Sequence, residues 1–301
     1  MARVIAHYPM SEYRSGIFKP GAFHLVPFDS EVPGLHDRRV PHRHDFFEIV
    51  WLRSGRGRLI CDLQHHTFGP GSLVLISPGQ VHSWSFDAPT VGQIASFTPE
   101  FLALGPDCPV LLSKMPFLYS DHPSPLLSCD GEESRRIESV LAQFEDLTRD
   151  EGVGRDDMAR AYLIVLLSLV RQSFARRAHM GSEPKPAAET DLLVQRFRLA
   201  LEQHMPGVVE VGVLARQLRV SRSQLNEALR RGTGRSASEI IHHRVLLEAK
   251  RVLLHSTLTI AEIAYRLKFQ DPSYFGRFFR KYSGMTPGAY REAMQRESLV
   301  A

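Results

Sequence analysis

The 301-residue sequence predicts an α+β protein, with a β-barrel and a helical hairpin in the N-terminal part and an all-α C-terminal part. Between about residues 20 and 100, short runs of strand-forming residues alternate with glycine and proline, which is typical of a small barrel or sandwich. Apolar residues then follow the i, i+3, i+4, i+7 spacing of amphipathic helices. In the last third, a short helix, a tight break and a capped second helix occur twice, fifty residues apart.

The strands of the first part are predicted from apolar segments that end in glycine-containing turns. The segments are residues 48–52, 59–63 and 73–76, and the turns are residues 54–57, 69–71 and 78–79. Strands this short, with turns this frequent, favour a closed all-β unit over a sheet covered by helices. We therefore expect a barrel domain over residues 1–130.

A helical hairpin is predicted over residues 131–178. The apolar stripe of its first helix consists of Ile137, Val140, Leu141, Phe144 and Leu147. Gly152 and Gly154 then interrupt the helical pattern, and a second helix follows over residues 158–176. The stripe can pack against a second copy of the chain or against the barrel of its own chain, and the sequence leaves both open.

An all-α domain is predicted over residues 191–295, after a linker at 179–190 that centres on Gly181–Pro186. Its helix starts carry capping boxes, in which a Ser or Thr side chain and a Glu or Gln three residues later satisfy each other's backbone donors. The pairs are Ser221 with Gln224, Ser236 with Glu239, and Thr259 with Glu262. The connector between the two repeats is predicted as one helix over residues 237–255.

Composition indicates a folded chain without disulfides. Apolar residues make up 43% and charged residues 23% of the sequence, as in globular proteins. Cys61, Cys108 and Cys129 form no CxxC pair, which favours a reducing cytosol. The N-terminus has no apolar run typical of a signal peptide, and the most apolar stretch, residues 161–170, is shorter than the ~20 residues of a membrane span. We expect a cytoplasmic protein with no membrane partner.

The net charge of +4 is unevenly distributed along the chain. From Asp191 to the end, 18 Lys and Arg face 10 Asp and Glu, a net charge of +8, while residues 1–190 hold 19 against 23, a net charge of −4. A basic balance confined to the C-terminal part favours a polyanionic partner for that part.

The two repeats form helix-turn-helix patterns, and their residues carry a family resemblance. The second repeat contributes Ile260-Ala261-Glu262-Ile263-Ala264, Phe269, Asp271, Ser273-Tyr274-Phe275, Arg277, Phe279, Lys281, Gly284, Thr286-Pro287 and Tyr290-Arg291, and the first contributes Leu214-Ala215, Ser221, Leu225, Leu229 and Gly234. This region resembles the DNA-binding domain of the AraC/XylS family of bacterial transcription regulators. Three positions depart from the pattern: Lys268 replaces a usual glycine, Val245 a usual arginine (with Arg244 one place early), and Leu229 a usual phenylalanine.

By position, the resemblance implies base contacts from Ser223, Asn226, Glu227, Ser273 and Arg277. The chemistry agrees, because Arg277 can chelate guanine, Asn226 can chelate adenine, and Glu227 can accept a hydrogen bond from cytosine. Phosphate contacts are predicted from Arg222, Arg230, Arg280 and Lys281. Each of these side chains also fits an ordinary solvated helix face, so the prediction rests on the whole set.

A second constellation lies in the barrel segment. His42, His44 and Glu48 occupy alternate positions, so on one extended strand their side chains point to the same face, and His82 lies on a later strand. The spacing HxHxxxE followed by a later GxxH resembles the cupin barrel family, although Phe86 stands where that pattern has asparagine. Three histidines and one glutamate can hold a divalent metal with open positions. The same residues, with Trp84, can instead line a site for a small organic effector, and both interpretations stay open.

These observations predict a DNA-binding transcription regulator that responds to a small-molecule effector in the cupin-like domain and that is not an enzyme. No cofactor is predicted beyond a divalent metal at His42, His44, Glu48 and His82. The expected partners are double-stranded DNA, the effector, a second copy of the chain and RNA polymerase. The alternative is a metal-dependent cupin enzyme fused to a DNA-binding domain.

Overall fold

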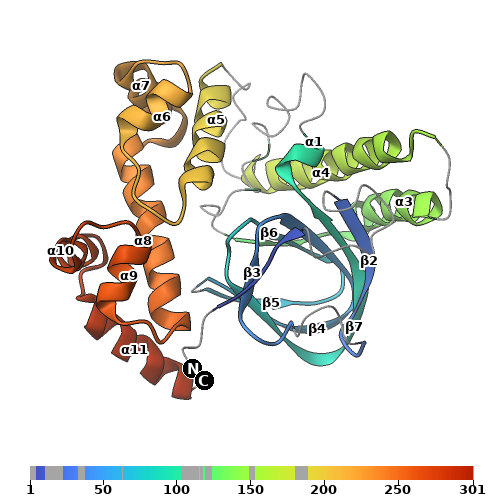
Figure 1. The fold of residues 1–301 in the computed structure, drawn as a ribbon. Coiled ribbons are helices and arrows are strands. Elements are labelled where there is room, and N and C mark those ends of the chain that lie inside the picture. The colour runs from blue at the N-terminus through green and yellow to red at the C-terminus, as the bar shows by residue number, and fades with distance from the viewer. Residues whose placement is uncertain are drawn as a thin grey trace. The chain divides into compact units, whose positions relative to one another are not determined.

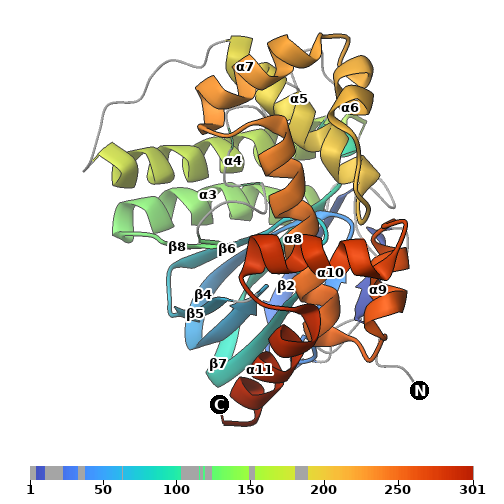
Figure 2. The same ribbon diagram turned by 90° about the vertical axis from the view of Figure 1, so that its left-hand side faces the viewer.

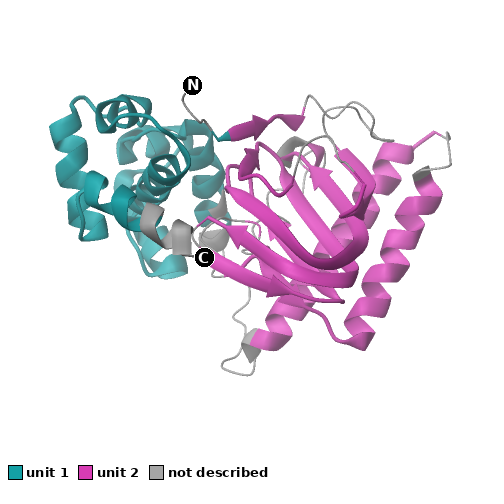
Figure 3. Cartoon of the chain, turned by 90° about the horizontal axis from the view of Figure 1, so that it is seen from below, with its two compact units in different colours: residues 1–5, 187–301 teal, residues 6–186 magenta. Residues whose placement is uncertain are grey.

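The computed structural model divides the chain into two compact units, residues 6–186 and residues 187–301, the second of which takes in residues 1–5 (Figure 3). The structure describes residues 5–10, 23–32, 38–62, 64–102, 115, 118, 124–148, 153–179 and 189–300. The predicted linker Gly181–Pro186 lies outside these residues. The α+β composition, with strands in the first unit and helices alone in the described residues from 189 onward, confirms the predicted fold class.

The first unit contains a curved eight-stranded sheet (Figure 1). Its strands are β1 (Ala6–Tyr8), β2 (Phe23–Asp29), β3 (His42–His44), β4 (Phe47–Cys61), β5 (Gln64–Phe68), β6 (Ser72–Ile76), β7 (His82–Phe97) and β8 (Leu126–Ser128). The order is β1-β3-β7-β4-β6-β8, with β2 also paired to β7 and β5 to β4. The long antiparallel strands β4 and β7 therefore form the spine to which every other strand except β1 and β8 pairs directly.

The pair β4–β7 bends sharply at its middle. Its register shifts between Leu52 and Gly57, which is the signature of β-bulges. Gly55 sits in this stretch with φ +96°, and a Cβ there would lie 2.2 Å from Oγ1 of Thr90. Only glycine meets both demands, so the predicted turn at 54–57 is instead a kink within one continuous strand that lets the sheet curl.

Alternation along the strands separates the inside of the sheet from the outside. Val50, Leu52, Phe28 and Trp84 belong to one buried cluster inside the curl. Trp51, of opposite parity on β4, donates its indole N–H to Glu138 at 2.6 Å and so faces the helical hairpin. Because side chains alternate between faces along a strand, Trp51 cannot also line the interior.

The hairpin consists of α3 (Gly131–Thr148) and α4 (Arg155–His179), which lie side by side against the outside of the sheet, after the short helix α1 (Pro99–Leu102) (Figure 1). Phe144 of α3 stacks on Phe23 of β2 with ring centroids 5.6 Å apart. The apolar stripe of α3 thus packs on the barrel of its own chain. The part of α4 from Arg155 to Arg177 is long and apolar enough to cross a membrane, as are the core helices of many soluble proteins. A third of its most apolar 18 residues is buried in the structure.

The second unit is an arrangement of helices along the connector α8 (Figure 2). The helices are α5 (Glu189–His204), α6 (Val211–Gln217), α7 (Arg222–Thr233), α8 (Ala237–His255), α9 (Ile260–Arg266), α10 (Pro272–Ser283) and α11 (Pro287–Val300). The predicted capping boxes at Ser221, Ser236 and Thr259 are all present. The connector has the predicted bounds, because its ends are coded by local capping residues.

Both helix-turn-helix turns use a left-handed residue that is not glycine. Arg219, after α6, has φ +57°, and Lys268, after α9, has φ +60°. Lys268 is the position where the family pattern has glycine, so this departure places a side chain in the left-handed conformation in which glycine is least strained. The recognition helices α7 and α10 end on ordinary left-handed glycines, Gly234 and Gly284.

A buried ion cluster joins α5 to α8. Arg244 makes a two-pronged contact with Glu202 of α5, at 2.7 and 2.9 Å, and lies 3.6 Å from Glu248. Arg251, which is fully buried, contacts Glu248 at 3.3 Å. Arg244, one place before the usual arginine position, therefore ties the first helix-turn-helix unit to the connector.

Candidate nucleic-acid interface and barrel site

Helix α7 has a buried inner face and an exposed outer face. Leu225, Ala228 and Leu229 face the core of the unit. Four of the predicted contact residues are exposed on the helix: Arg222, Ser223, Glu227 and Arg230. Glu227 forms an exposed i,i+4 ion pair with Arg231 at 2.6 Å, a weak surface contact that a base could displace.

Asn226 differs from the other predicted base contacts of α7, because it is half-buried and its side-chain amide is engaged within the domain. Its Nδ2 donates to the carbonyl oxygen of Arg222 at 3.1 Å. Its Oδ1 accepts a hydrogen bond from the backbone N–H of Ala237 at 2.9 Å. Ala237 is the first residue of α8, so this side chain joins the recognition helix to the connector.

Helix α10 repeats this construction. Phe275, Phe278 and Phe279 form its buried face. All four predicted contact residues on it, Ser273, Arg277, Arg280 and Lys281, are exposed. The Arg277 guanidinium lies 5.9 Å from the centre of the Tyr274 ring, which is itself half exposed. The helix begins at Pro272, where Asp271 accepts a hydrogen bond from the Tyr274 N–H and leaves the first turn regular.

The barrel site gathers the predicted histidines and glutamate, but from three strands. His42 and His44 lie on β3 and His82 on β7, while a bend at residues 45–46 separates β3 from β4, which carries Glu48. The prediction that one extended strand presents His42, His44 and Glu48 is therefore wrong. All four side chains are nevertheless buried, because β3 and β4 both pair with β7.

Three of the four residues bring ligand atoms together. The ligand atoms of His44, Glu48 and His82 all lie within 4.8 Å of one another. His42 is outside this set, although its ring centroid is only 4.2 Å from that of His82, and it packs edge-on against Tyr8.

Backbone carbonyls orient the histidine rings. Nδ1 of His44 lies 2.8 Å from the carbonyl oxygen of Phe46, and Nδ1 of His82 lies 3.1 Å from that of Gln80. A carbonyl oxygen only accepts hydrogen bonds, so Nδ1 carries the proton in both rings and, in the neutral ring, Nε2 carries the lone pair. This is the tautomer that a metal ligand needs.

Glu48 is protonated more readily than an ordinary carboxyl. Burial raises its pKa to about 7, and the positive charge of Arg38 opposes part of the rise. Arg38 is not predicted from the sequence as a residue of this site, since it lies outside the HxHxxxE motif. Its guanidinium lies 5.0 Å from the centre of the Phe28 ring inside the sheet.

Trp84 sits beside the histidine cluster, two residues along β7 from His82. It is buried among other aromatic rings, with Phe28 at 5.8 Å, Phe68 at 5.5 Å and Phe86 at 6.3 Å between ring centroids. The inside of the sheet thus has a histidine-rich end and an aromatic region. Arg53 of β4 forms an ion pair with Glu138 at 2.8 Å on the hairpin side.

Comparisons with known proteins separate along the same two units. Residues 33–124 match the AraC-like ligand binding domain, and residues 214–293 match a helix-turn-helix domain. The chain is 25% identical over 250 residues to the HTH-type transcriptional activator RhaR of Salmonella typhimurium, which covers 83% of this chain and 86% of that protein.

Solved structures are also similar. ToxT from Vibrio cholerae O395 is 14% identical with a TM-score of 0.37, covering 91% of this chain and 98% of that one. The DNA-binding domain of AdpA, solved in complex with a target DNA, is 30% identical with a TM-score of 0.32, covering 35% of this chain and 94% of that one.

Proposed function

Because this chain belongs to the AraC family of transcription regulators, we propose that its recognition helices α7 and α10 read two adjacent major-groove segments of one DNA duplex. The observation that carries the proposal is the repeated surface of the two helices. Each buries an apolar face and exposes polar side chains at matching positions fifty residues apart, such as Ser223 with Ser273 and Glu227 with Arg277. A helix of this kind fits the major groove, where the residues of its first turns meet base edges.

Base selection in the second unit rests on Arg277. Its guanidinium is exposed, and the five donors of that group can chelate the O6 and N7 atoms of one guanine. Replacing it by alanine is expected to weaken specific binding by ~1–3 kcal/mol and to relax preference at a single base pair. Gel-shift titrations on a series of single-base operator variants measure both effects.

Arg280→Ala is the matched control, since Arg280 lies one turn further along the same helix and is assigned to a phosphate. It is expected to weaken binding to every operator variant by a similar factor, because a phosphate contact carries no sequence information. If the two variants lose affinity by the same pattern across the operator variants, Arg277 does not contact a base.

The effector is assigned to the inside of the barrel, at His42, His44, Glu48, His82 and Trp84. What supports this is the juxtaposition of buried polar groups with aromatic rings, which suits a ligand with a polar end and an apolar body. The effector shifts DNA binding only as far as it binds the two states of the protein with different affinity.

At the polar end, we assign a divalent cation to His44, Glu48 and His82. The donor set fits, since two imidazoles and one carboxylate lie within 4.8 Å of one another and both rings are oriented by carbonyls through Nδ1. Such a cation supplies open coordination positions for a polar group of the effector. Glu48 must be deprotonated to bind it, whereas its burial favours the protonated form.

Zinc binding tests this assignment without any assay of regulation. At a free zinc concentration of 100 Kd, the full chain is expected to gain about 2.7 kcal/mol of stability, measured by thermal unfolding. His44→Ala is expected to remove the gain and the metal content of the purified protein, while His65→Ala, which alters an exposed histidine on β5, keeps both. Equal metal content in the two variants would contradict the site.

The hairpin is assigned to a homodimer contact. What supports this is that Met158 and Val165, seven residues apart on α4, are 46% and 45% exposed on a helix that otherwise packs on α3. We also propose that the protein acts in the cytoplasm. RNA polymerase is a further partner in this proposal.

A further inference from the structure

The starting observation is the orientation of the Asn226 amide, which faces the connector helix. Both of its polar atoms make hydrogen bonds inside the second unit, Oδ1 with the N–H of Ala237 at 2.9 Å and Nδ2 with the carbonyl of Arg222 at 3.1 Å. Chelating an adenine requires both atoms to point at the base edge together. Reading a base would therefore break the bond to Ala237.

That bond completes the hydrogen bonding of a helix start. The first backbone N–H groups of α8 have no partner within the helix. Ser236 accepts from the N–H of Glu239 at 3.4 Å, and Glu239 accepts from the N–H of Ser236 at 2.7 Å. The N–H of Ala237, a fully buried residue, is satisfied by Asn226 across the α7–α8 junction.

The second repeat solves the same problem in another way. Fifty residues after Asn226 and Ala237 stand Gly276 and Pro287, and Pro287 is the first residue of α11 as Ala237 is of α8. Proline has no N–H to satisfy and suits the first position of a helix. Gly276 has no side chain, and a Cβ built there meets no atom within 4 Å. Asparagine thus occurs where the N–H is present, and glycine where it is absent.

We propose that Asn226 is a positioning residue that holds recognition helix α7 at its angle to connector α8, and that base selection by the first repeat rests on Ser223 and Glu227. This inference rests on the proposed DNA-reading function and differs from the base contact implied by family resemblance. Asn226 acts through the orientation of α7, so its loss affects every operator sequence alike.

The test compares single and double variants of the full chain on single-base operator variants. Asn226→Ala is expected to weaken binding about tenfold on each of them, with the order of preference unchanged. Asn226→Ala combined with Ala237→Pro is expected to bind within about threefold of the natural protein, because proline removes the N–H that has lost its partner. Ser236 has φ −76° and ψ 161°, which a following proline requires.

Two further variants keep the outcome interpretable. Ala237→Pro alone, with Asn226 intact, reports by its thermal unfolding whether proline fits at this position. Asn226→Asp retains an oxygen that accepts from Ala237 and lacks the N–H donors needed for adenine, so its order of base preference is expected to match the natural protein.

Altered preference at one base pair in Asn226→Ala or Asn226→Asp would overturn the inference, as would absence of rescue by a proline that fits. These results leave the proposed function intact. That function fails separately if the natural chain selects no DNA sequence.

Discussion

At the scale of single residues, backbone conformation and side-chain chemistry make separate demands at Lys268. Its φ of +60° is the left-handed conformation that glycine adopts most easily, and its side chain passes over Gly207, where a Cβ would lie 2.4 Å from Cδ of the lysine. Lys268 thus has a strained backbone conformation, and its side chain contacts the other half of the unit. The two halves are also joined by a hydrogen bond from the N–H of Val208 to the carbonyl of Leu267.

Lys268→Gly is expected to stabilise the second unit by about 0–1.5 kcal/mol from the backbone alone, less the contribution of the lost contact with Gly207, and so to be more stable than Lys268→Ala. Relief of the left-handed conformation contributes roughly 1–2 kcal/mol, and the greater freedom of glycine in the unfolded chain offsets roughly 0.5–1 kcal/mol. Urea denaturation followed by helical circular dichroism measures the change. Lys268→Ala keeps the strain and removes only the contact, so it should destabilise, and a gain from alanine equal to that from glycine would contradict the account.

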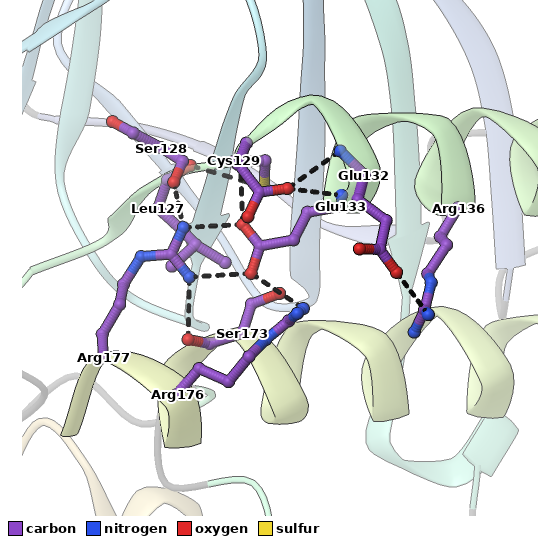
Figure 4. Close-up of polar contacts among 10 residues, drawn as sticks. Leu127, Ser128, Cys129, Glu132, Glu133, Arg136, Ser173, Arg176 and Arg177 are labelled. Atoms are coloured by element: carbon purple, nitrogen blue, oxygen red, sulfur yellow. Dashed lines mark hydrogen bonds and ion pairs between the residues drawn. The ribbon is translucent and has the colours of Figure 1, made fainter. Parts of the chain in front are cut away.

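At the scale of elements, an ion cluster fastens the hairpin to the barrel. Glu133 at the start of α3 is 3% exposed and contacts Arg177 of α4 at 2.7 Å and Arg176 at 3.0 Å (Figure 4). The Arg177 guanidinium also donates to the carbonyl of Ser128 on β8. One side chain therefore links both helices and, through Arg177, the last described strand of the sheet.

This cluster predicts acid sensitivity of the first unit. Although burial works in the opposite direction, hydrogen bonds from Arg177, Ser173 and the backbone N–H of Asp130 lower the pKa of Glu133 to about 2. Since the folded pKa lies below the unfolded value of 4.5, the stabilisation is present above pH 4.5 and is lost as the pH falls toward 2.

Intrinsic fluorescence isolates the first unit, because both tryptophans, Trp51 and Trp84, belong to it. The unfolding free energy is expected to drop between pH 4.5 and 2 in the natural protein. Glu133→Gln should be less stable at pH 7 by about 1.5–3 kcal/mol, the range for hydrogen bonds to charged groups, and should show a flatter profile over that interval. Parallel profiles for the two proteins would assign the acid sensitivity to other carboxyls.

At the scale of the whole molecule, charge and repeat spacing point to one extended DNA site. The connector α8 has 19 residues and so spans about 28 Å at ~1.5 Å per residue. Successive major grooves on one face of the duplex are ~34 Å apart, a separation that a rigid helix of this length can serve. Buried Arg251 and Arg244, with their glutamate partners, stiffen that connector.

The operator is therefore expected to tolerate no change in phasing. Inserting five base pairs between the segment read by α7 and the segment read by α10 rotates the second segment by half a turn of the duplex. Because α8 holds the two recognition helices at a fixed separation, they cannot bind both segments at once, and affinity should fall roughly 100-fold or more. Fluorescence anisotropy on labelled duplexes measures this loss. A single-base substitution in the same spacer serves as control, and equal affinity for the inserted and natural operators would mean that the two helices do not bind together.

The features of the fold that could be predicted are those determined by residues close together in the sequence. Helix starts at Ser221, Ser236 and Thr259 are coded within four residues, so capping chemistry alone placed them correctly. The apolar stripe of α3 was predicted from periodicity in the same way, because its signal also lies within a few helical turns. The break between β3 and β4 was not predicted, because residues 45–46 are Asp and Phe and contain neither the glycine nor the proline that usually marks a turn.

The sequence by itself determined the two-part organisation, the repeated helix-turn-helix units and the residue types available on each recognition helix, since all of these depend on neighbours in the chain. Only the tertiary structure decided that the ligand atoms of His44, Glu48 and His82 lie close together and that His42 is outside this group. It also decided that the Asn226 amide meets the N–H of Ala237, eleven residues away. Such contacts depend on strand register and on the angle between helices, which are set by packing across the whole unit and have no counterpart in a local pattern.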